Sequence, residues 1–119
     1  MFTLAAILSA AICLIHIFAG GKQIAAPLRA TEALHPVVRD TNYLCWHLTT
    51  AGIAAIALAF TLATLTANPA YAVMGTVLSG AFAATGLWLV PRIGQPYRHM
   101  PQGWFFVPAT LLGLWGLLG

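Results

Sequence analysis

The sequence predicts an all-α fold, a bundle of four transmembrane helices that run up, down, up and down. Of the 119 residues, 61% are hydrophobic and only 6% are charged. A soluble domain carries about 25% charged residues, which keep its surface hydrated, so this composition suits lipid as the solvent. Four long apolar runs are the second observation. We expect one domain, residues 1–119, with helices at about 2–20, 36–66, 71–90 and 104–118.

The first two helices have local signals at their ends. Gly20-Gly21-Lys22 closes the first apolar run, and residues 23–34 suit a short interfacial helix that is broken or kinked at Pro27. Pro36 is well placed as the first residue of the second helix, because that position needs no backbone N–H donor. This helix should enter lipid near Leu44, so that its first two turns stand among the head groups.

The last two helices are marked by proline. Asn68-Pro69 is a turn signal, and the resulting short connection makes the second and third helices antiparallel neighbours. The third apolar run ends at Pro91. The fourth helix, about 16 residues from Trp104, reaches only about 24 Å by helical rise. A bilayer core of about 30 Å would then have to thin locally, or the helix would have to stand with little tilt.

The charge distribution predicts the orientation in the membrane. All five Lys and Arg residues lie in the loops 21–43 and 91–103, and none lies near the termini or in the 67–70 turn. Basic residues in short loops stay on the cytoplasmic side, so we expect both loops in the cytoplasm, both termini outside, and a bacterial inner membrane. Any homo-oligomer should be parallel. Basic residues spread beside apolar runs argue against nucleic-acid binding.

Two polar stripes carry most of the chemistry. Spacings of three and four residues place each set on one face of its helix. The stripes are Ser9-Cys13-His16-Gly20 in the first helix and Asp40-Tyr43-His47-Thr50 in the second. Because lipid satisfies no polar group, the stripes should face each other. His16 and His47 should then meet near the cytoplasmic end, with Asp40 above His47.

This pair of histidines allows three interpretations. Facing histidines at one level of a bundle can hold haem b or a metal ion, and Cys13 would add a third ligand. The histidines can equally form one interhelical hydrogen bond, or they can bind a proton or a polar ligand.

The cytoplasmic loops supply a rim of polar residues around this end. The rim consists of Arg29, Glu32, Arg39, Arg92, Arg98 and His99. It is either a solvated surface in contact with lipid head groups or a site for an anionic or amphiphilic small molecule.

No Walker loop, nucleophile elbow or zincin motif is present. We therefore expect a binding protein or an accessory subunit of a larger membrane complex, rather than an enzyme. A haem or metal redox protein and a small transporter or channel are the alternatives.

One stretch resembles a known family. The residues His16-x-x-x-Gly20-Gly21, followed by Pro27-Leu28-Arg29, are similar to the small four-helix membrane proteins of the copper-resistance-D and membrane protoporphyrinogen-oxidase type. The resemblance covers about thirty residues around His16 to Arg29. In the protoporphyrinogen-oxidase members such a histidine implies haem binding, which would fall here on His16.

The charge argument predicts which side of the membrane each loop occupies. A tag at residue 119 should be accessible from outside the cell, and a tag inserted near Thr31 should be accessible only from the cytoplasm. Impermeant labelling of intact and opened cells measures both. The opposite labelling pattern would show that the five basic residues do not set the orientation.

Overall fold

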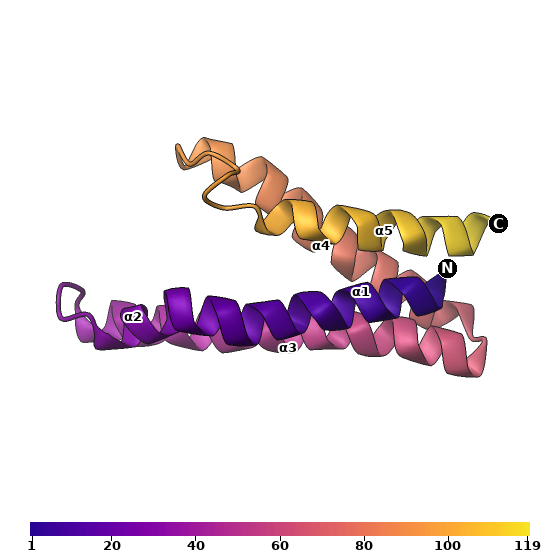
Figure 1. Cartoon of the computed structure of the whole chain (residues 1–119), viewed down its shortest axis with the longest axis horizontal. Helices are drawn as coiled ribbons and strands as arrows, with labels where there is room; N and C mark the ends of the chain where they lie inside the picture. Colours follow the sequence, from indigo (N-terminus) through magenta and orange to yellow (C-terminus); the bar gives the residue numbers. More distant parts are fainter.

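The computed structural model describes all 119 residues and confirms that the fold is all-α (Figure 1). No strand is present. In chain order the helices are α1 (Phe2–Ile15), η1 (His16–Ala25), α2 (Ala26–Ala30), α3 (Pro36–Thr66), α4 (Pro69–Arg92) and α5 (Gln102–Leu118).

The first helix is longer than its apolar run predicts. It does not end near residue 20, because α1, η1 and α2 form one continuous helix, Phe2–Ala30. The η1 segment is a π-helix, and the N–H of Ala26 donates to the carbonyl of Gly21, five residues earlier. This wider spacing precedes Pro27, which stands in the first turn of α2, where a missing N–H matters least. A π-helical stretch therefore carries the chain past a residue that would otherwise break the helix.

α3 begins at Pro36 as predicted, whereas α4 begins at Pro69, two residues before the predicted start near residue 71. Pro36 is the first residue of α3, and Nδ1 of His35 accepts a hydrogen bond from the N–H of Val37 at 3.3 Å. At α4, Oδ1 of Asn68 accepts from the N–H of Ala70 at 3.0 Å. Both caps satisfy N–H groups that have no partner inside the helix.

The loop after α4 folds back onto that helix. Pro91 has no N–H, so it cannot donate to the carbonyl of Leu87 as a residue four positions later normally does. The hydroxyl of Tyr97 donates to this carbonyl instead, at 2.6 Å. The helix consequently continues to Arg92, past the predicted stop, and the loop is tied beside its last turns.

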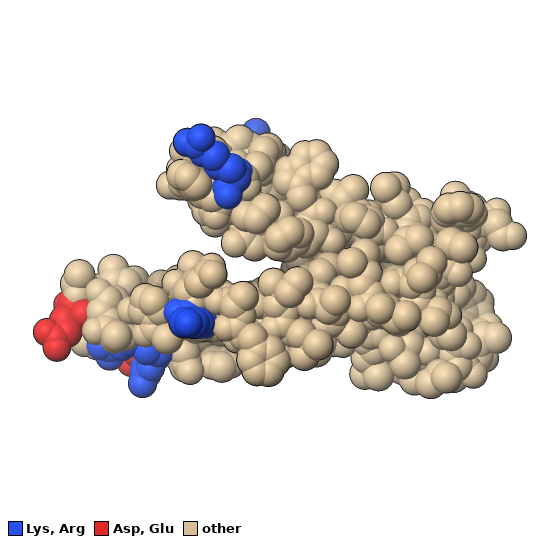
Figure 2. Space-filling model, viewed as in Figure 1, with Lys and Arg blue, Asp and Glu red and all other residues tan.

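The helices run up, down, up and down, and both chain termini lie at one end of the molecule (Figure 1). The long helix Phe2–Ala30 packs along α3, while α4 packs on α3 and α5. Toward the loop end, α4 diverges from α3. We call the η1–α2 segment with the first half of α3 the long arm, and the end of α4 with loop 93–101 and the start of α5 the short arm. The space-filling view in Figure 2 shows a cleft between the arms, with the charged side chains gathered on their tips.

Close packing is concentrated in the half that holds the termini. Phe60 is fully buried, and a Cβ added at Gly75 or Gly113 would lie 3.0 Å from its ring. Outside that half, where α4 leads into α5, the backbones of Gly86 and Gly103 also meet directly, since a Cβ at Gly103 would lie 2.8 Å from the carbonyl carbon of Gly86. Small residues let helices approach closely where lipid gives no hydrophobic force between them.

Three helices are long and apolar enough to cross a membrane: Phe2–Ala30, α3 and α4. The apolar helix α5 is shorter, at 17 residues. Large apolar side chains are also widely exposed, and Phe18, Leu65 and Trp115 each show more than half of their surface. A chain that leaves this much apolar surface uncovered is suited to lipid rather than to water.

The contact between Gly86 and Gly103 predicts a sharp sensitivity to one methyl group. Gly103→Ala should cost about 1–3 kcal/mol of unfolding free energy, because the new Cβ meets backbone that cannot rotate away. Gly80→Ala is the matched control on the same helix pair, since its Cβ would make an ordinary contact with Thr110 at 3.4 Å. Thermal unfolding in detergent measures both variants. Equal stability of the two would contradict the close approach.

Candidate functional site

Trp46 is the centre of the contact between the first helix and α3 at the charged end. The imidazole of His16 stacks on its indole, with ring centroids 3.9 Å apart and planes 14° apart. One turn further, a Cβ at Gly20 would lie only 2.7 Å from the indole, so the missing side chain makes the space that Trp46 occupies. The first stripe therefore faces α3, as the spacing predicts: Ser9 is buried, and His16 and Gly20 lie against Trp46.

The second stripe lies beside this contact rather than across it. Trp46, and not His47, occupies the central position on α3 and covers His16. His47 is exposed and packs edge-on against Tyr43, with ring centroids 4.7 Å apart. Nε2 of His16 is buried and has no hydrogen-bond partner, and His47 contacts Tyr43 instead of the His16 ring. Asp40 likewise bonds to arginine and not to His47.

The sequence contains a pattern that could have predicted that Trp46 faces the first helix. Trp46 precedes Ile53 by seven residues, which places it on the same face of the helix. That face continues through Ile56 and Phe60, all of which are buried. The preference of tryptophan for membrane interfaces hides this role, because it explains Trp46 without any helix partner.

The three residues predicted as metal or haem ligands have different surroundings. No group of three or more His, Cys, Asp or Glu side chains is close enough together to hold a metal ion. Cys13 packs against the hydrophobic core instead. Iron ligation through Nε2 of His16 would need the contact around Trp46 to open, because this atom is covered.

A network of charged and aromatic side chains joins α2 to the start of α3. Oδ1 of Asp40 accepts hydrogen bonds from Nη1 of Arg29 and from Nε of Arg39, each at 3.0 Å. The Arg29 guanidinium also lies over the ring of Tyr43, 5.0 Å from its centroid. Tyr43 in turn contacts His47. The chain of contacts therefore runs from the cationic rim down the side of α3.

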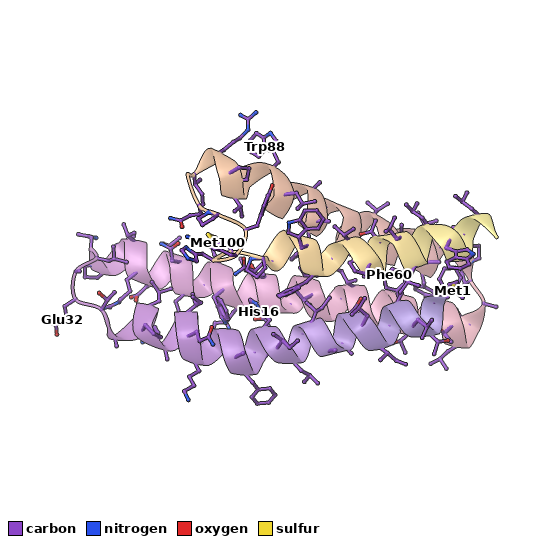
Figure 3. The ribbon with its side chains drawn as sticks, turned by 45° about the horizontal axis from the view of Figure 1, so that its top comes forward. Met1, His16, Glu32, Phe60, Trp88 and Met100 are labelled. Carbon is purple, nitrogen blue, oxygen red and sulfur yellow. The ribbon has the colours of Figure 1, made fainter.

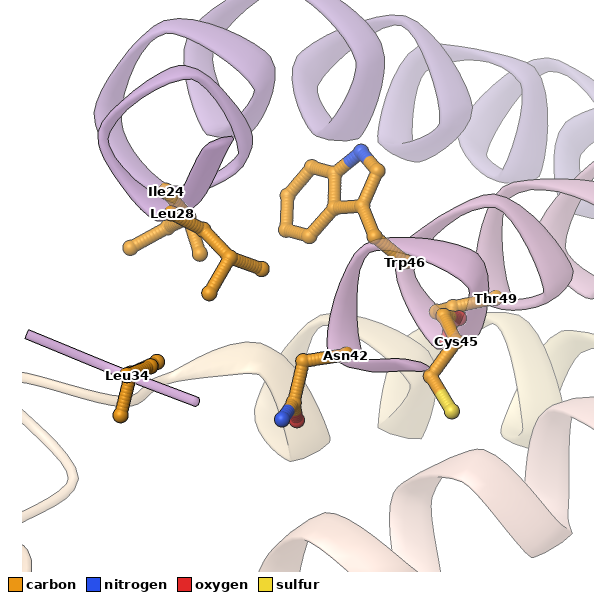
Figure 4. A pocket seen from close by; sticks show the side chains of 7 residues that line it. All are labelled: Ile24, Leu28, Leu34, Asn42, Cys45, Trp46 and Thr49. Carbon is orange, nitrogen blue, oxygen red and sulfur yellow. Dashed lines mark hydrogen bonds between the residues drawn. The ribbon is translucent and has the colours of Figure 1, made fainter. Parts of the chain in front are cut away.

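Two hollows flank Trp46. The outer groove, of ≈ 850 Å³, lies between η1–α2 and α3; it is lined by Ile17, Gly21, Ala25, Ala26, Arg29, Ala30, Tyr43, Trp46, His47 and Thr50. The inner hollow, of ≈ 450 Å³, is shown in Figure 4; it is lined by Ile24, Leu28, Leu34, Asn42, Cys45, Trp46 and Thr49. The outer groove alone joins a cation, Arg29, to small and apolar residues, so it has the form of a site for an amphiphile.

The six predicted rim residues divide between the two arms. Arg29, Arg39 and Glu32 lie on the long arm, and Figure 3 shows Glu32 at its tip. The others, Arg92, Arg98 and His99, belong to the short arm, where the guanidinium of Arg92 lies 4.3 Å from the Trp88 ring centroid. No ion pair joins the arms, since both ion pairs in the molecule involve Asp40. The rim is therefore not one continuous site.

Comparison with protein-family models, with curated proteins and with solved structures finds no match for this chain. The functional argument accordingly depends on the geometry of the two hollows and of the charged network.

Adjacent glycines provide a matched test of the Trp46 contact. Gly20→Ala should be less stable than Gly21→Ala, because its Cβ would push the outer edge of the indole away from His16. Gly21→Ala is the control, since its Cβ would meet nothing within 4 Å. Trp46→Phe should rescue Gly20→Ala, because it removes the part of the indole that collides. Thermal unfolding of the two single variants and the double variant measures this coupling, and additive effects would argue against it.

Proposed function

We propose that this chain is a small integral membrane protein that binds an amphiphilic ligand in the outer groove between η1–α2 and α3. In the proposed orientation, loops 21–43 and 91–103 face the cytoplasm of a bacterial cell, and the groove opens at that side. The observation that carries the proposal is the composition of the groove. A cation stabilised by Asp40 stands at one end, and Ile17, Gly21 and Ala25 form the other.

Binding is better supported than catalysis or redox chemistry. The groove contains Tyr43, His47 and Thr50, but the hydroxyl of Thr50 donates to the carbonyl of Trp46 in its own helix. Tyr43 and His47 contact each other edge to face, without a hydrogen bond between them. A nucleophile with an adjacent base is therefore not assembled. Nε2 of His16 is covered, which gives a redox metal no direct access to that atom.

Transport is less well supported because the other half of the bundle is closed. Phe60 fills the space between Gly75 and Gly113. The hydroxyls of Thr76 and Ser79 are bonded to carbonyls of α4. A ligand can thus enter from the charged end or from the side, which suits a binding or accessory role in the membrane.

Filling the groove tests this function. Gly21→Leu should remove amphiphile binding without unfolding the protein, because the new side chain would extend into the groove where no protein atom stands. Ala11→Leu adds bulk on an exposed part of the first helix outside the groove and is the control. Native mass spectrometry of protein purified in mild detergent measures the amphiphile that each variant retains. Equal retention by Gly21→Leu and the wild type would refute the groove as the site.

A further inference from the structure

We propose that the outer groove binds an anionic membrane lipid, with its phosphate head group at Arg29 and its acyl chain along Gly21 and Ile17. This inference rests on the binding function proposed above and names the class of ligand. It depends on three features: an unbalanced charge at the mouth of the groove, a fixed guanidinium, and an open apolar trough.

The ion-pair cluster of Arg29, Arg39 and Asp40 carries one net positive charge. Arg29 and Arg39 both bond to the same oxygen of Asp40, so one carboxylate serves two guanidinium groups. Each guanidinium has five N–H donors, and each gives only one of them to Asp40. The Arg29 side chain is 51% exposed, which leaves its other donors accessible. A guanidinium in this condition matches the oxygens of a phosphate in charge and in geometry.

Asp40 and Tyr43 fix the position of the Arg29 guanidinium. Asp40 holds one edge of the group, and the ring of Tyr43 lies beneath it at 5.0 Å. A side chain that is already ordered loses less conformational entropy when a ligand binds. We therefore treat Asp40 as a positioning residue, although its negative charge by itself repels an anion.

The trough below Arg29 is shaped for a hydrocarbon chain. Gly21 leaves open space, and Ala25 and Ile17 continue the wall along η1. On the opposite wall, Tyr43 to Thr50 spans about 10 Å by helical rise. Because the Thr50 hydroxyl is bonded within α3 at 3.0 Å, it presents no unsatisfied polar group to a chain. The first part of an acyl chain fits here, and the remainder would continue in the bilayer.

Lipid selectivity in purified protein tests the head-group assignment. In mixed micelles with equal phosphatidylglycerol and phosphatidylcholine of the same chains, native mass spectrometry should find the wild type enriched in phosphatidylglycerol. Arg29→Gln should reduce this enrichment roughly tenfold, the effect of losing one hydrogen bond between charged groups. Arg92→Gln is the control, because it removes the same charge from the short arm, where Arg92 lies over Trp88 and not in the groove. An equal loss in both variants would overturn the proposal.

A second variant separates positioning from simple attraction. Asp40→Asn adds one positive charge to the rim, so attraction by net charge alone would increase the enrichment in phosphatidylglycerol. If Asp40 holds Arg29 in place, the enrichment should instead fall toward that of Arg29→Gln. An increase would overturn the positioning role. Size-exclusion chromatography shows whether each variant stays folded and monodisperse.

Two further measurements identify the source of the anion and show whether the lipid assignment alone fails or the groove as a binding site fails with it. Inorganic phosphate should not displace phosphatidylglycerol, because the acyl chain contributes to binding; displacement would point to a soluble anion and overturn the lipid assignment. If the wild type retains both lipids equally and Gly21→Leu retains neither, the head-group assignment is overturned but the groove remains a binding site. If Gly21→Leu retains as much lipid as the wild type, both the head-group assignment and the groove as the binding site are overturned.

Discussion

The irregular features of the chain pair backbone groups with partners inside the protein, as a lipid environment would require, because lipid offers no hydrogen-bond partners. Pro91 leaves the Leu87 carbonyl without its helical donor, and the Tyr97 hydroxyl replaces it. Pro27 is accommodated by a π-helical stretch in which N–H groups donate five residues back. Threonine hydroxyls along α3 donate to carbonyls four residues earlier in the same helix. Two buried side-chain atoms remain without a hydrogen-bond partner, Oγ of Ser9 and Nε2 of His16.

The packing of the bundle depends on missing side chains more than on large ones. Gly75 and Gly113 enclose Phe60, and Gly86 meets Gly103 backbone to backbone. The Phe60 contacts join α4 and α5 to α3 in the half that contains the termini, and the Gly86–Gly103 contact holds α4 to α5 in the short arm. At the other end no such contact ties the arms, which diverge (Figure 2). The cleft therefore lies where no glycine contact joins one arm to the other, and the groove lies within the long arm, where Gly20 contacts Trp46.

Helix class and the start at Pro36 could be predicted because they depend on local chemistry: apolar runs and proline at a first turn. The predicted start of α4, near residue 71, is too late, because Asn68-Pro69 indicates a turn in the sequence but is a cap followed by a first helical residue in the structure. The first stripe was also predictable, since lipid forces polar groups toward a partner. The partner itself was not, because whether Trp46 or His47 faces His16 depends on about one residue of helix rotation. The extension of the first helix to Ala30 was equally hidden, because the sequence shows Gly20, Gly21 and Pro27 as helix-ending residues, whereas η1 continues through them.

The two adjacent glycines have separate roles, and this separation links the fold to the groove. Gly20 faces the indole of Trp46, which sets how closely η1 approaches α3. Gly21 is rotated away from that contact and leaves the trough open. A side chain at either position would alter the groove, but by different means: at Gly20 it would push the walls apart, and at Gly21 it would fill the space between them. Ligand binding at this site therefore requires the close approach of η1 to α3 as well as the opening beside it.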